Sequence, residues 1–121
     1  MARERFSSSA SPAADGRKPW STTFPDCNNG CGPVTTPVFD KAGNLYGEAA
    51  GGYSCGGGYC GTVWKLTPEK NGKWTYTLLY KFSPNTGVFP EGVIVDAKGH
   101  LFGTTLSGGK YDFGVAFEIT P

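Results

Sequence analysis

The chain repeats one eight-residue segment, and this repeat limits its fold more than any other feature does. Residues 40–47 read DKAGNLYG, and residues 96–103, which begin 56 positions later, read DAKGHLFG. A second pair follows in the same order, GTVWKLTP at 61–68 and GVAFEITP at 114–121, at an offset of 53 positions. The offsets differ because of the glycine-rich stretch between the two segments, where a change of loop length is best tolerated. Two ordered segments at nearly one offset indicate a unit that occurs about twice.

The composition predicts an all-β fold. Glycine makes up 19 of the 121 residues and aromatic residues make up 14%, whereas glycine usually accounts for about 7% of a globular protein. Intrinsic disorder needs low hydrophobicity and high net charge, and this chain has neither. Frequent turns between short aromatic strands are typical of a sandwich, a barrel or a propeller.

Each unit is predicted to hold antiparallel strands separated by turns. The DKAGN segment at 40–44 is a predicted turn, because aspartate bonds the local backbone and glycine supplies a positive φ. No segment has a persuasive apolar period of 3.6 residues, so we expect almost no helix. The expected strands are 34–40, 44–49, 62–66 and 74–82 in the first unit, and 92–96, 100–106 and 115–119 in the second.

Four antiparallel strands in roughly 50 residues are typical of a propeller blade. We therefore expect about two four-stranded antiparallel propeller-like blades. The alternative is a small β-sandwich, because two units do not close a ring by themselves. The expected organisation is a disordered tail at 1–16, a remnant of a fourth strand plus a cysteine loop at 17–33, a first complete blade at 34–88 and a second, incomplete blade at 89–121.

Charge and hydropathy argue against nucleic-acid binding and against a transmembrane segment. Eleven basic and ten acidic residues are interspersed and give a net charge of +1, whereas a nucleic-acid-binding protein needs a basic stripe. No apolar run approaches the ~18–20 residues of a transmembrane helix. Residues 1–16 also lack the apolar centre of a secretory signal. We expect neither nucleic-acid binding nor a transmembrane segment.

The repeated segments resemble GloVer-type tandem-repeat proteins, whose repeats read GNLYGTT, then GG, then GTVFKLTP. The matches here are GNLYG at 43–47, GTVWKLTP at 61–68 and the link LYKFS at 79–83. The second unit also matches the two threonines, while the first departs from them with Glu48-Ala49. The resemblance covers about 34–121. It implies a bacterial, propeller-like protein of unknown activity that is exported or attached to the cell surface, and therefore an extracellular location.

The four cysteines form two closely spaced pairs, Cys27 with Cys31 and Cys55 with Cys60. In an up-and-down blade, the loops that carry these pairs emerge on the same face. Local disulfides are the first interpretation, since each would close a short loop and would suit an exported protein. A zinc site ligated by all four cysteines and a set of unpaired thiols remain as alternatives.

Aromatic residues in the glycine-rich loops are the candidate ligand contacts. They flank glycines at the expected loop face, where a flat ring can stack on a sugar or a peptide. The alternative is that the rings fold back and cap the blade. The candidates are Tyr53, Tyr59, Tyr111 and Phe113.

No set of residues specifies catalysis, so we expect no catalytic residues and no cofactor. The single histidine, His100, occupies the turn position that Asn44 holds in the first unit. Asp40 and Asp96 are equivalent in the repeat, so a turn-forming role explains both better than a catalytic pair does. No G-x-S-x-G or phosphate-loop motif is present.

The sequence therefore favours a non-enzymatic extracellular β-repeat segment that acts as a scaffold or binding surface for a glycan or a protein. We also expect further blades from a parent chain or from a homo-oligomer, because a lone blade cannot bury both faces. Two alternatives remain open. One is a fragment of a larger propeller enzyme whose catalytic residues lie elsewhere. The other is a small zinc-stabilised module with four cysteine ligands.

Overall fold

The structure is a computed structural model that describes residues 3–6, 8–10, 20–22, 24, 27, 30–51, 55 and 58–121. Within these residues every regular element is a strand, which confirms the all-β prediction. The same part of the chain contains no helix long and apolar enough to cross a membrane. The strands are β1 (Arg3–Phe6), β2 (Ser8–Ala10), β3 (Trp20–Thr22), β4 (Val38–Phe39), β5 (Leu45–Ala49), β6 (Thr62–Pro68), β7 (Trp74–Lys81), β8 (Val88–Val95), β9 (Leu101–Ser107) and β10 (Ala116–Ile119).

The first sheet is an antiparallel meander in which β4, β5, β6 and β7 are neighbours in chain order. β5 pairs with β6 so that Gly47 lies opposite Trp64, and the register between β6 and β7 shifts between Val63 and Trp64. β1 pairs with the outer edge of β7 and places Arg3 opposite Thr77. These four meander strands correspond to the four strands predicted for the first unit.

The second sheet is a three-stranded antiparallel meander of β8, β9 and β10. It corresponds to the three strands predicted for the second unit, but β8 begins at Val88 rather than at the predicted Gly92. The register of β8 shifts between Pro90 and Val93. Such an irregularity interrupts the alternation of apolar and polar side chains, and this hid the first half of the strand.

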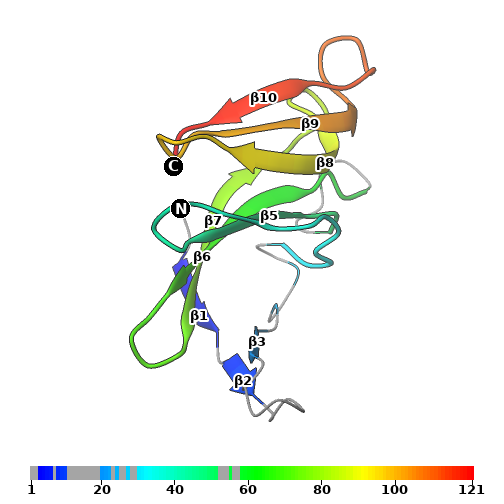
Figure 1. Cartoon of the computed structure of the whole chain (residues 1–121). Coiled ribbons are helices and arrows are strands. Elements are labelled where there is room, and N and C mark those ends of the chain that lie inside the picture. Colours follow the sequence, from blue (N-terminus) through cyan, green and yellow to red (C-terminus); the bar gives the residue numbers. More distant parts are fainter. Residues whose placement is uncertain are drawn as a thin grey trace.

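The two sheets pack against each other, with β8 next to β5 (Figure 1). Buried side chains from both sheets form one core between them, including Tyr46 and Val63 of the first sheet and Val93 and Leu101 of the second. Strand alternation directs the neighbouring residues of β5 and β6 to the opposite face. That face carries a second core, where Phe24 packs against Trp64 and Tyr76. The arrangement is compatible with a small β-sandwich or with adjacent blades.

The turn before β5 and the turn before β9 use the same hydrogen bonds. Oδ1 of Asp40 accepts from the backbone N–H groups of Ala42 and Asn44, both at 2.9 Å. Oδ1 of Asp96 accepts in the same way from Lys98 and His100, also at 2.9 Å. The turn-forming role that the sequence predicted for both aspartates is therefore observed.

An aromatic ring also covers a glycine at the same place in each sheet. A Cβ atom added to Gly47 would overlap the ring of Trp64, and one added to Gly103 would overlap the ring of Phe117. In both cases the two residues are direct cross-strand partners. The absence of a side chain lets the ring approach the backbone of the neighbouring strand closely, which is a known way to stabilise glycine in a sheet.

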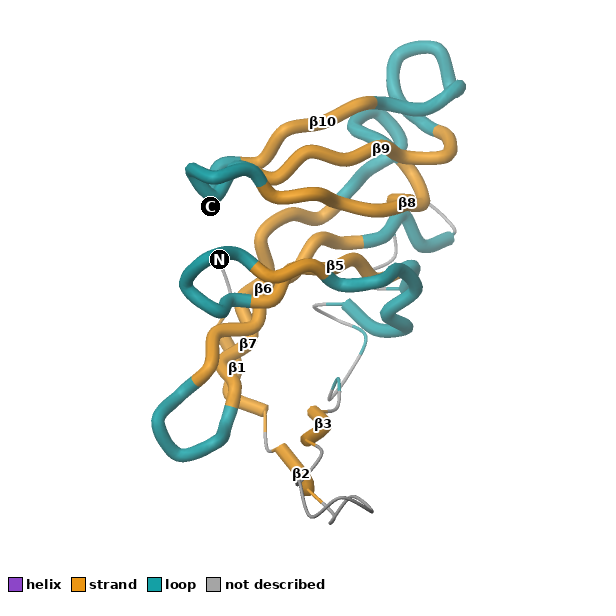
Figure 2. The backbone as a smooth tube through the Cα atoms, viewed as in Figure 1, coloured by secondary structure: helices purple, strands orange, loops and turns teal. Residues whose placement is uncertain are grey.

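The connections divide between two ends of the sheets (Figure 2). The tight turns 40–44, 69–73 and 96–100 join β4 to β5, β6 to β7 and β8 to β9. Because successive antiparallel strands reverse direction, these three turns lie at one end of the sheets. The longer segments 50–61 and 108–115, together with 82–87, lie at the other. We call this second group, in its described residues, the loop end.

The first part of the chain differs from the expected organisation. Residues 1–16 contain β1 and β2, where we expected a disordered tail. The outer edge of β7 offers backbone N–H and C=O groups, and β1 pairs with them. The sequence around Trp20, expected to be a remnant of a blade's fourth strand, forms β3, which pairs with β2. β8 begins at Val88 and therefore crosses the expected boundary between the blades.

Candidate functional site

Three of the four candidate aromatic residues lie at the loop end with their rings exposed. The exposed fractions are 53% for Tyr59, 71% for Tyr111 and 90% for Phe113. Rings that cap a sheet would be largely buried, so these values argue against the capping interpretation. The fourth candidate, Tyr53, lies outside the described residues.

Backbone hydrogen bonds give the β9–β10 loop a defined shape. The N–H of Gly114 donates to the C=O of Gly108 at 3.0 Å and closes the base of the loop. The N–H of Gly109 donates to the C=O of Pro84 at 2.8 Å, which ties this loop to the β7–β8 loop. Nζ of Lys110 lies 5.3 Å from the centroid of the Tyr111 ring. The aromatic residues of this loop are therefore carried by a backbone that hydrogen bonds fix in place.

Phe89, near the start of β8 and hydrogen-bonded to the loop end, is a further exposed aromatic residue that the sequence analysis did not name. Its side chain is exposed, and its backbone lies in the left-handed region with a φ of 59°. Bulky residues rarely adopt this conformation. A hydrogen bond of 2.8 Å from the N–H of Phe89 to the C=O of Cys60 holds it. No pattern in the sequence signals a positive φ at a phenylalanine.

The structure does not bring all of these rings together. Within the described residues, no ring contact joins Tyr59 to Tyr111 or Phe113. Tyr59 comes from the β5–β6 connection, whereas Tyr111 and Phe113 share the β9–β10 loop. The exposed rings of the loop end therefore lie on two separate connections.

Both cysteine pairs are disulfides, Cys27–Cys31 and Cys55–Cys60, as the first interpretation had it. They reinforce the segments that flank β5 and β6. The N–H of Gly51, just after β5, donates to the C=O of Cys31 at 2.9 Å, and Cys60 lies just before β6. A zinc site needs thiolates, and both pairs are consumed by disulfides. Among the described residues, no group of three or more potential metal ligands comes together.

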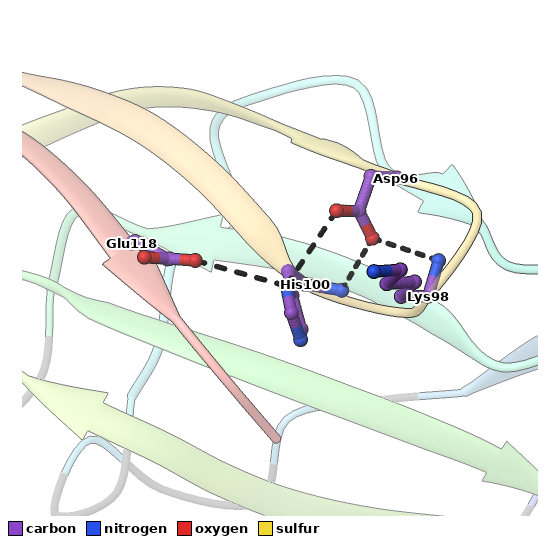
Figure 3. A network of polar contacts seen from close by, with 4 residues as sticks. All are labelled: Asp96, Lys98, His100 and Glu118. Atoms are coloured by element: carbon purple, nitrogen blue, oxygen red, sulfur yellow. Dashed lines mark hydrogen bonds and ion pairs between the residues drawn. The ribbon is translucent and has the colours of Figure 1, made fainter.

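The single histidine lies in a polar network at the opposite end, as Figure 3 shows. Nδ1 of His100 is 3.6 Å from a carboxylate oxygen of Asp96 and 3.7 Å from one of Glu118. Hydrogen bonds from the backbone N–H of His100, and from those of Lys98 and Gly99, lower the pKa of Asp96. A catalytic triad needs a nucleophile next to the imidazole, whereas the side chains that His100 contacts in Figure 3 are two carboxylates.

The two aspartate turns lie side by side around a hollow of about 180 Å³. The carboxylates that line it are engaged within their own turns. Oδ2 of Asp40 accepts from Asn44 at 2.9 Å and from the hydroxyl of Tyr46 at 3.0 Å. Burial opposes ionisation of Asp40, but the hydrogen bonds from Asn44, Tyr46 and Ala42 outweigh it and lower its pKa. Burial and the bond to Asp40 raise the pKa of Tyr46 to about 12. These contacts stabilise the turn.

A buried carboxylate lies between the sheets. Glu48, on β5, has no exposed surface. Its Oε2 is 3.5 Å from the Thr35 hydroxyl, and the backbone N–H of Gly92 donates to the carboxylate. Its Oε1 has no hydrogen-bond partner among the described residues. Burial raises the pKa of Glu48 to about 7, and the negative charge of Glu91 acts in the same direction. The hydrogen bonds from Gly92 and Thr35 act in the opposite direction but do not outweigh burial. The sequence marked this position, because the first unit has Glu48-Ala49 where the second unit has two threonines.

Comparisons with protein-family models, with curated proteins and with solved structures gave no match.

Proposed function

We propose that the chain is a non-enzymatic extracellular scaffold that binds a glycan through the aromatic residues of the loop end. The observation that carries the proposal is the exposure of Tyr111 and Phe113 on a hydrogen-bonded loop. Exposed apolar rings gathered at one place are more typical of a binding surface than of an inert one.

The chemistry around the rings favours a sugar over a purely apolar ligand. Tyr111 combines a flat ring with a hydroxyl, and it lies between Lys110 and Asp112, whose side chains are exposed. A ring can stack on the apolar face of a sugar while neighbouring polar groups bond to its hydroxyls. The two disulfides are compatible with an oxidising, extracellular location. Adjacent blades of a GloVer-type repeat would provide the rigid frame for these loops.

The test is binding of the oxidised chain to an array of immobilised oligosaccharides, followed by affinity measurements on the best binder. Tyr111→Ala and Phe113→Ala should each weaken binding by at least about tenfold, which corresponds to ~1.4 kcal/mol. Phe39→Ala is the matched control, because Phe39 is also an exposed aromatic residue but precedes a turn at the opposite end. Glycan binding that is unchanged in both loop variants would refute the proposed site. Capture of a protein ligand, with no glycan bound, would refute the proposed ligand.

A further inference from the structure

The outer edge of β10 is open. Among the described strands, β10 pairs only with β9, whereas β6, its counterpart in the first sheet, pairs with β5 on one side and β7 on the other. The edge of a sheet presents unpaired N–H and C=O groups that can accept another strand. Among the described strands, β10 therefore has no neighbour equivalent to β7.

The register shows which groups of β10 point to the open side. The N–H of Thr105 donates to the C=O of Val115 at 2.8 Å, and Thr105 and Val115 lie just beyond the pairing of Thr104 with Ala116. In an antiparallel pair, hydrogen-bonded and non-hydrogen-bonded positions alternate. The backbone groups of Phe117 and Ile119 are therefore directed to β9, and those of Ala116 and Glu118 to the open edge.

An apolar groove runs along this edge. It encloses about 160 Å³ and is lined by Tyr80, Phe82, Phe117, Glu118 and Ile119. This volume is below the ~300–1,000 Å³ of pockets for drug-sized molecules, so it suits one or two side chains. The groove continues the core between the sheets, since Phe82 belongs to that core and contacts Phe117 edge to face, with 5.1 Å between ring centroids.

The first sheet shows what fills the equivalent place. Trp64 and Leu66 of β6 are the counterparts of Phe117 and Ile119, and their partners on β7 are Leu78 and Tyr76. All four of these β6 and β7 side chains are buried in one core. A strand added to β10 would place large apolar side chains opposite Phe117 and Ile119, on the side of the groove.

We propose that the open edge of β10 binds an extended segment of another polypeptide by β-strand addition. The segment lies antiparallel to β10, carries aromatic or aliphatic side chains at alternate positions, and fills the groove with two of them. Opposite Glu118, whose side chain is exposed, a basic residue is favoured over an acidic one. This mode of recognition takes its affinity from main-chain hydrogen bonds and its specificity from the alternate side chains. The surface is separate from the proposed glycan-binding loops.

The test uses the full oxidised chain and a synthetic peptide with the sequence of residues 74–82, extended by lysines for solubility. We expect saturable binding and slower hydrogen exchange at the amides of Ala116 and Glu118, with little change at Phe117 and Ile119. A peptide in which the counterparts of Tyr76 and Leu78 are serine should bind at least about tenfold more weakly. No binding by the first peptide, or slowed exchange that does not distinguish the two pairs of amides, would overturn the proposal.

A matched pair of variants tests the main-chain hydrogen bond. Glu118→Pro removes an N–H that points away from β9, and proline is accepted at such positions of edge strands. It should abolish peptide binding, whereas Glu118→Gln should keep it. Equal binding by both variants would contradict strand addition. If Glu118→Pro does not fold, Tyr80→Ala replaces it, since Tyr80 lines the groove from the other side. That variant should weaken binding at least about tenfold, and unchanged affinity would count against the groove.

Discussion

The buried carboxylate of Glu48 should make the stability of the fold depend on pH. Its pKa is about 7 in the folded chain against an ordinary value of 4.5. Below about pH 4.5 the side chain is protonated in both states, and its full contribution to stability is present. As the pH rises from about 4.5 to about 7, the unfolded chain releases this proton while the folded chain retains it, so stability falls. Above about 7 both states are ionised, and the loss levels off.

The size of the effect follows from the difference between the two pKa values. Roughly 2.5 pH units at ~1.4 kcal/mol each give a loss of about 3 kcal/mol across this range. Glu48→Gln keeps the shape of the side chain but cannot ionise between the sheets. The free energy of unfolding of this variant, relative to the wild type, should therefore rise by about 3 kcal/mol between pH 4.5 and pH 8.

Urea unfolding, followed by tryptophan fluorescence at both pH values under non-reducing conditions, measures this difference. Asp112→Asn is the matched control. It also neutralises a carboxylate, but an exposed one, and asparagine accepts the positive φ of 63° at that position. The control should not change the pH dependence. If Glu48→Gln and wild type differ by the same free energy at both pH values, the carboxylate is not buried between the sheets as described.

Two further substitutions test features that occur once in each sheet, the glycine covered by an aromatic ring and the aspartate turn. Gly47→Ala should destabilise the fold by about 1–3 kcal/mol in urea unfolding, because its methyl group would overlap the Trp64 ring; Gly58→Ala, in open space, should be near neutral, and equal effects would contradict the packing. Asp40→Ala should cost about 2 kcal/mol at pH 7, since it removes hydrogen bonds from the turn and from Tyr46. Because the pKa of Asp40 is lowered in the folded chain, its contribution to stability should be present above about pH 4 and lost as the pH falls through the folded pKa. An unfolding free energy that the substitution leaves unchanged at pH 7 would argue against this role.

Local sequence chemistry predicted most of the two meanders. Alternating apolar residues and Asp-Gly turns act within a few residues of one another, so the strands from β4 to β10 and both aspartate turns could be derived without tertiary information. The two disulfides were the first interpretation for the same reason, since each closes a short loop, but the cysteine spacing alone left a zinc site and unpaired thiols open. The exposed candidates Tyr59, Tyr111 and Phe113 could be named because glycines flank them.

The missed features depend on contacts between distant segments. β1 forms because the edge of β7 is available, and no local pattern in Arg3–Phe6 encodes that edge. Phe89 has a positive φ at a place where its N–H donates to the C=O of the distant Cys60. The burial of Glu48 results from the packing of β8 on β5, although its departure from the repeat marked the position. Tertiary packing outweighs local preference at each of these places.

The most direct test of the central claim is a backbone NMR titration of the oxidised, isotope-labelled chain with the oligosaccharide that it binds best. The account predicts that chemical shifts change at Phe89 and in 108–115, while the turns 40–44 and 96–100 stay unchanged. Changes centred on those two turns, or no change with any oligosaccharide, would contradict the proposal that the loop end is a glycan-binding surface.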